Sequence, residues 1–130
     1  MAIDVPAQIL YWKDGAAEEL DVAQTLLTAR KLRQAGFFIH LAVEKALKAR
    51  VVAATHKLAP KIHDLLELAN RAKIELTPES GKFLGRLQTY CFEGRYPDKM
   101  PAPPLAKNLE RDLKAAEEII LWLNAPLKNP

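Results

Sequence analysis

The sequence predicts an all-α fold, an up-and-down helical bundle of four main helices plus one short helix, in a single domain of residues 1–130. Apolar residues make up 49% of the chain, whereas aromatic residues make up only 7%. The apolar residues are nearly all aliphatic or alanine, a composition that favours helices over strands. They also recur at steps of three and four along most of the chain, which is the helical period. We therefore expect no strand.

The first two helices are expected to be long. The first covers residues 7–31, where apolar residues at positions 9, 16, 20, 23 and 27 form one stripe. The second covers residues 32–55, and its apolar face is so wide that we expect a central, heavily buried helix. Its high alanine content allows neighbouring helices to approach closely.

The third and fourth helices are predicted from their starting signals. The third begins at Pro60, a good first-turn residue, and runs to residue 73. The fourth begins with Thr77, Pro78 and Glu79, which supply a cap, a first-turn proline and a first-turn carboxylate. It is expected to end at about residue 92.

A proline-rich segment separates these helices from the last one. Residues 93–104 contain four prolines, too many for a helix or a central strand. The fifth helix is expected over residues 104–124 and has the cleanest amphipathic stripe of the chain.

Motifs and cysteine usage exclude several classes of protein. The single cysteine, Cys91, excludes an intramolecular disulfide and every metal site that needs several cysteines. The three histidines lack the spacing of a helical metal chelate, and no nucleotide-binding glycine-rich motif occurs, so we predict no metal and no cofactor. The sequence shows neither a signal peptide nor a membrane span, so we expect a soluble, cytoplasmic protein.

The charge balance gives a mixed indication about nucleic acids. Lysine and arginine number 19 against 16 acidic residues, and a net charge of +3 is weak evidence for polyanion binding. The basic residues nevertheless gather in two places, at positions 30, 31 and 33 and at positions 45, 48 and 50. A local basic cleft of this kind can bind phosphate without a high net charge.

A stripe of polar residues follows one side of the second predicted helix: Arg33, His40, Glu44 and Lys48. Periodicity favours a solvated face that carries a Glu44–Lys48 ion pair. The alternative is a polar seam inside the bundle or at a dimer interface, because the helix is apolar over most of its circumference.

Two short segments are further candidates for a site. In the His63–Asp64 pair, Asp64 suits the positive end of a helix, and His63 could be fixed by hydrogen bonding as part of a site. The second segment holds Arg95, Tyr96 and Asp98 around Pro97. It is either a structural helix stop or an anion site, in which Arg95 would bind phosphate and Tyr96 would stack on a base.

Three segments of the chain resemble one known family. These segments are FFIHLAVEKALKARVVA, PKIHDLLELA and YCFEGRYPD. The first resembles the second-helix signature of HEPN (higher eukaryote and prokaryote nucleotide-binding) domains, the second the "IHDL" helix that follows, and the third the "RYP" segment before the last long helix. All three occur in the family's order and spacing, and the resemblance covers about residues 7–124.

The resemblance implies a fold similar to the substrate-binding domain of kanamycin nucleotidyltransferases. It also implies a homodimer and a minimal nucleotidyltransferase as partner, in a toxin–antitoxin-like pair. The implied function is a nucleotide- or RNA-phosphate-binding module. The candidate ligand-binding residues are Arg95, Tyr96, Asp98, His63, His40, Glu44 and Lys48.

Many HEPN proteins are metal-independent ribonucleases with an Arg-x4–6-His motif near the start of the last long helix. No histidine follows Arg95 in this chain, and the two other matches, Arg33 to His40 and Arg50 to His56, lie on the second helix. Binding is therefore the leading hypothesis. A ribonuclease that combines Arg95 with His63 is one alternative, and a helical scaffold without a ligand is another.

Overall fold

The structure, a computed structural model, describes residues 2–91 and 102–127. These residues form five α-helices and no strand, which confirms the all-α prediction. The helices are α1 (Val5–Thr28), α2 (Leu32–Thr55), α3 (Leu65–Arg71), α4 (Pro78–Gln88) and α5 (Ala106–Asn124). None of these helices combines the length and apolarity needed to cross a membrane.

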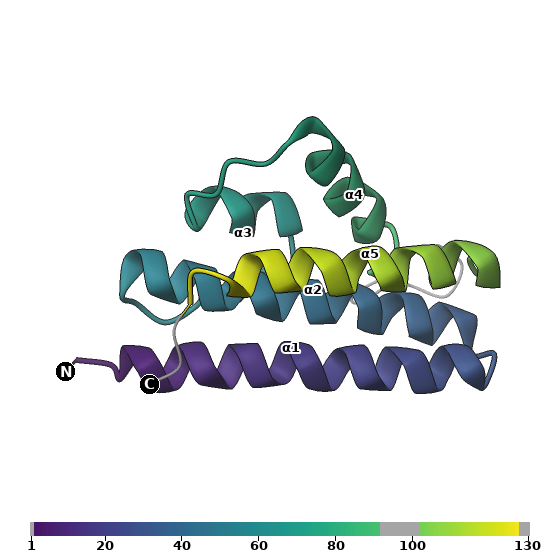
Figure 1. Ribbon diagram of the computed structural model, residues 1–130, viewed down its shortest axis with the longest axis horizontal. Coiled ribbons are helices and arrows are strands. Elements are labelled where there is room, and N and C mark those ends of the chain that lie inside the picture. Colours follow the sequence, from purple (N-terminus) through teal and green to yellow (C-terminus); the bar gives the residue numbers. More distant parts are fainter. Residues whose placement is uncertain (1, 92–101, 128–130) are drawn as a thin grey trace.

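The four main helices, α1, α2, α4 and α5, alternate in direction along the bundle (Figure 1). Helix α1 runs one way and α2 returns beside it, the short helix α3 runs in the same direction as α2, and α4 runs back obliquely. Helix α5 runs in the same direction as α2. The up-and-down prediction is confirmed for these four helices, and α3 is the one additional short helix.

Helix α2 lies at the centre of the bundle. It contacts α1, α3, α4 and α5, and its contact with α1 is the most extensive between any two helices. Four alanines of α2 are fully buried, as are Ala16 and Ala23 of α1, so small side chains line these contacts. The prediction of a central, heavily buried second helix is confirmed.

Three predicted helix ends were wrong. Helix α1 ends at Thr28, three residues before the expected end, because Arg30 adopts a left-handed φ of 61° and the N–H of Lys31 bonds back to the Leu26 carbonyl. Helix α3 begins at Leu65 and not at Pro60, because the Asp64 carboxylate accepts hydrogen bonds from the backbone N–H groups of Leu66 and Glu67 and so caps the helix there. Helix α4 begins at Pro78 behind its Thr77 cap, as predicted, but ends at Gln88, four residues before the expected end. Residues 60–63 therefore precede the helix, and His63 among them contacts His40 and Glu44 of α2.

A buried carboxylate joins α4 to α5. Asp112 of α5 is fully buried and accepts hydrogen bonds from Arg86, from the hydroxyl of Tyr90 at 2.6 Å, and from the neighbouring Arg111. Burial alone would raise the pKa of Asp112, but these three donors outweigh it and hold the pKa below its usual value. Burial and the Asp112 carboxylate raise the pKa of Tyr90.

The ring of Tyr90 reaches Asp112 by passing over Gly36 of α2. A Cβ atom at Gly36 would lie 3.1 Å from Cγ of Tyr90 and 3.3 Å from Cδ2 of Leu109. A larger residue at this position therefore requires the side chain of Tyr90 or Leu109 to shift. Gly85 of α4 differs, since a Cβ atom there would meet nothing within 4 Å.

We predict opposite effects for alanine at these two glycines. Gly36→Ala is expected to lower the free energy of unfolding by about 1–2 kcal/mol, because the added methyl group overpacks a filled site. Gly85→Ala is expected to raise it by about 0.5–1 kcal/mol, because alanine is the better helix former and has open space. Urea unfolding followed by circular dichroism measures both. Equal effects of the two substitutions would contradict the packing of Tyr90 over α2.

Candidate functional site

Three of the four residues in the predicted polar stripe of α2 lie inside the bundle, and the fourth, Arg33, is partly buried. We call the side chains of His40, Glu44, Lys48 and the nearby His63 the α2 seam. The residues His40, Glu44 and Lys48 are only 1%, 3% and 6% exposed. The favoured interpretation as a solvated face was therefore wrong, and the alternative of a polar seam inside the bundle is confirmed. The physical reason is that α1, α3, α4 and α5 all cover α2 and leave this stripe little access to water.

The Glu44 carboxylate is the centre of the seam. Its Oε1 atom lies 3.0 Å from Nδ1 of His63, and its Oε2 atom accepts a hydrogen bond of 3.0 Å from Nζ of Lys48. Nδ1 of His40 lies farther away, 3.9 Å from Oε1. A buried carboxylate is tolerated when donors satisfy its oxygens, and here each oxygen has one within hydrogen-bond distance.

The Lys48 ammonium also contacts α1. Its Nζ atom lies 5.2 Å from the ring centroid of Trp12, the geometry of a cation–π contact. Trp12 did not figure among the sequence-predicted site residues. A signal was nevertheless present, because Trp12 continues the apolar stripe of the first helix three residues after Ile9 and four before Ala16.

His63 connects the seam to the surface. Its side chain is 48% exposed, while its Nδ1 atom contacts the buried Glu44. Its backbone carbonyl accepts a hydrogen bond of 3.1 Å from Nε2 of His40. Since a carboxylate can only accept, Nδ1 of His63 carries the proton of this contact, and Nε2 occupies the opposite edge of the half-exposed ring. A half-exposed imidazole of this kind can form a hydrogen bond to a ligand.

His40 is a neutral, structural member of the seam. Burial lowers the pKa of His40, although the charge of Glu44 and the hydrogen bond to the His63 carbonyl act against this. The neutral ring donates from Nε2 and so fixes the backbone at His63. The structure thus brings His40, Glu44, Lys48 and His63 together, as a site requires.

The remaining candidates are placed differently. Arg95, Tyr96 and Asp98 lie outside the described residues, so their part in the site stays a prediction. The basic residues at positions 45, 48 and 50 do not form a cleft, because each contacts a different internal partner. Lys45 pairs with Glu19 at 3.1 Å, Lys48 pairs with Glu44, and Arg50 donates to the Leu123 carbonyl at 3.2 Å.

The end of α4 lies close to His63. The side-chain Oε1 atom of Gln88 accepts a hydrogen bond from the backbone N–H of Leu65, two residues after His63. Gln88, the last residue of α4, therefore lies beside the segment that carries His63. Among the described residues, no group of three or more acidic, histidine or cysteine side chains could hold a metal ion.

Comparison with known proteins gives one match. The family model of the HEPN domain matches residues 9–125, which is most of the chain. No curated protein and no solved structure matches the sequence. The family indicated by the three sequence segments is confirmed.

The burial of His40 predicts a pH-dependent stability. The pKa of His40 in the folded protein lies below its ordinary value of 6.5. Between these two values the unfolded chain therefore binds more protons than the folded protein does. The free energy of unfolding is therefore expected to fall as the pH is lowered through 6.5. His40→Gln keeps a donor for the His63 carbonyl but does not titrate, and it should make this fall smaller. Urea unfolding at a series of pH values measures the slope.

The exposed His56 supplies the matched control for this experiment. It has a left-handed φ of 57°, which asparagine tolerates, so His56→Asn removes a histidine without removing a buried one. This variant should keep the slope of the original protein. An unchanged slope in His40→Gln would contradict the assignment to His40.

Proposed function

Because the chain belongs to the HEPN domain family, whose members are nucleotide- or RNA-related modules, we propose that it binds a nucleotide or RNA through phosphate beside His63. The observation that carries this proposal is the contact between the half-exposed His63 ring and the buried Glu44. The contact fixes the ring in one orientation before a ligand arrives, and preorganised groups lose less entropy on binding. A protonated His63 would donate to a phosphate oxygen from its outer edge.

The segment of Arg95, Tyr96 and Asp98 is proposed to complete this site. Its support is the sequence, which supplies a guanidinium for phosphate and a phenol ring for a base. Further support is the hydrogen bond between Gln88 and Leu65, because it places the end of α4 next to His63. His40 and Lys48 would act behind the site by holding His63 and Glu44 in place.

We also propose that the chain works with a minimal nucleotidyltransferase in a toxin–antitoxin-like pair and forms a homodimer. The support is the resemblance of the three segments to HEPN proteins of this kind. The likeness to the substrate-binding domain of kanamycin nucleotidyltransferases belongs to the same proposal.

A metal-independent ribonuclease is the second candidate, and the His63–Glu44 contact favours it. An imidazole whose Nδ1 contacts a carboxylate is a common arrangement for a general acid or base. In RNA cleavage such a ring would take the proton of a 2′-hydroxyl group. This candidate needs the same residues as phosphate binding, so one set of variants tests both.

Titration with AMP and with a short single-stranded RNA tests the binding site. The protein is expected to bind at least one of them in calorimetry, and His63→Gln is expected to weaken binding about 10- to 100-fold, the worth of one hydrogen bond to a charged group. Glutamine can still bond to Glu44 but cannot be protonated. His56→Asn should bind as the original protein does.

The same samples decide among the alternatives. Cleavage of the RNA in EDTA that His63→Gln abolishes would establish the ribonuclease. Binding that is equal in His63→Gln and His56→Asn would contradict the proposed site. No binding of either ligand by the original protein would favour a helical scaffold.

Co-expression tests the partner. The protein and the nucleotidyltransferase encoded beside it are expected to elute together from a size-exclusion column, at a mass above that of either alone. Light scattering on the protein by itself should give twice the mass of 14.6 kDa. Separate elution, or the absence of such a neighbouring gene, would contradict the pairing.

A further inference from the structure

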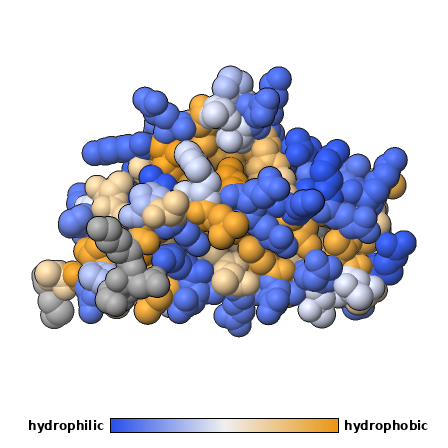
Figure 2. Space-filling model, viewed as in Figure 1, coloured by the Kyte–Doolittle hydropathy of each residue, from blue (hydrophilic) through white to orange (hydrophobic). Residues whose placement is uncertain are grey.

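A groove of about 400 Å³ lies between α4 and α5. It is lined by the first turns of α4, from Thr77 to Phe83, and by the second half of α5, from Ala115 to Trp122. None of its lining residues belongs to the α2 seam. Figure 2 shows apolar side chains at the surface between the layer of α3 and α4 and the helix α5. The groove is thus separate from the α2 seam and is lined by different residues.

The floor of the groove is apolar and one wall is an exposed tryptophan. Phe83 and Ile119 are each 8% exposed and form the floor, whereas Trp122 is 50% exposed. Leu121, on the adjoining face of α5, is 71% exposed. Tryptophan is enriched among the residues that dominate binding energy at protein interfaces, and exposed apolar surface of this kind marks interaction sites.

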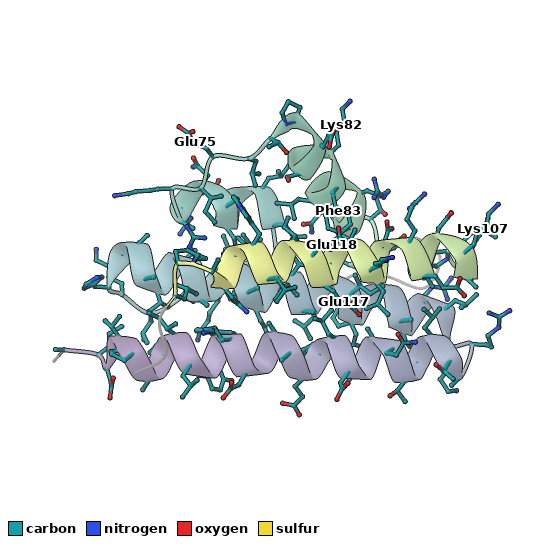
Figure 3. All side chains as sticks on the ribbon, in the orientation of Figure 1. Glu75, Lys82, Phe83, Lys107, Glu117 and Glu118 are labelled. Atoms are coloured by element: carbon teal, nitrogen blue, oxygen red, sulfur yellow. The ribbon has the colours of Figure 1, made fainter. Side chains whose placement is uncertain are left out.

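The ionised side chains that line the groove are both acidic. They are Glu79 of α4 and Glu118 of α5, in a chain whose net charge is +3. Neither makes a salt bridge to another described residue, so both are available as acceptors. Figure 3 shows Phe83 between the two helices with Glu118 on α5 beside it, while Lys82 points away from α5 at the top of α4.

The hydroxyl groups of the groove take part in the cap of α4. Oγ1 of Thr77 accepts from the backbone N–H of Ser80 and donates to Oγ of Ser80, so both hydroxyls serve the cap of α4. The groove therefore offers an occupant an apolar floor and two carboxylates. Phosphate is a poor match, because two carboxylates repel it, and this separates the groove from the proposed nucleotide site.

We propose that this groove is the docking site for a short amphipathic helix of a protein partner, with aliphatic side chains on one face and lysine or arginine beside them. The choice of partner rests on charge complementarity. Glu79 lies on the α4 wall and Glu118 on the α5 wall, so a partner helix with cations on both sides of its apolar stripe matches the groove. Aliphatic side chains of the partner helix cover Phe83 and Ile119 and contact Trp122. Helices that lie in apolar grooves with such anchors are a recurrent mode of recognition.

A designed peptide tests the proposal with the intact protein. The probe is a fluorescein-labelled helical 16-residue peptide with leucines at spacings of three and four residues and flanking lysines. Its two controls are a scrambled peptide and a peptide with glutamate in place of lysine. Fluorescence anisotropy is expected to show a dissociation constant below 1 mM for the lysine peptide and at least tenfold weaker binding for both controls.

Charge reversal identifies the binding surface. Glu118→Lys is expected to weaken binding of the lysine peptide at least tenfold and to strengthen binding of the glutamate peptide. Glu18→Lys, at an exposed position of α1, makes the same change in net charge and should leave both affinities unchanged. Trp122→Ala, also at an exposed position, should weaken binding of the lysine peptide without changing the helix content of the protein.

Three results would overturn the proposal. The first is equal binding of the lysine peptide and the scrambled peptide. The second is an equal effect of Glu118→Lys and Glu18→Lys. The third is a protein dimer that Glu118→Lys dissociates, together with no peptide binding, because the groove would then be an interface between two copies of this chain. None of these results changes the outcome of the nucleotide titration with His63→Gln, so the two proposals can fail independently.

Discussion

The Glu44 carboxylate lies in the interior of a bundle that is otherwise mostly apolar, and much of the architecture satisfies its two oxygen atoms. An unpaired buried charge costs several kcal/mol, roughly half the stability of an ordinary domain. One donor, Lys48, comes from the next turn of the same helix. The other, His63, comes from a separate segment and must be held against α2. Residues 60–64 are thus joined to α2 by the contact of His63 with Glu44, and Ile62 of the same segment packs against the apolar core.

A series of polar contacts extends from this carboxylate across the molecule. His63 contacts Glu44, and two residues later Leu65 donates its backbone N–H to Gln88. Tyr90, two residues beyond Gln88, donates to the buried Asp112 of α5. The start of α3, the end of α4 and the first half of α5 are therefore fixed relative to the seam. A half-exposed imidazole gains a defined position from this arrangement, which an isolated surface histidine lacks.

The sequence predicted the helices better than it predicted which parts of the chain pack against each of them. The bounds of α2 followed directly from its wide apolar face. Pro60 and Asp64 are both residues that suit a helix start, and α3 begins behind Asp64 because its carboxylate caps the first turn. Periodicity correctly placed His40 and Glu44 on one face. It could not show what covers that face, because the four covering helices and His63 come from other parts of the chain. The family resemblance was the one signal that joined these segments before their contacts were known.

The extensive contact between α1 and α2 has a consequence for the order of folding. These helices are neighbours in sequence, so their pairing closes only a short loop, and local contacts of this kind form fast. We expect this helical hairpin to form while Glu44 is still hydrated, and the segment with His63 to dock afterwards. The reverse step, detachment of that segment alone, would let water reach the seam while the hairpin stays intact. In hydrogen exchange, the amide of Leu65 should then exchange faster than the central amides of α2.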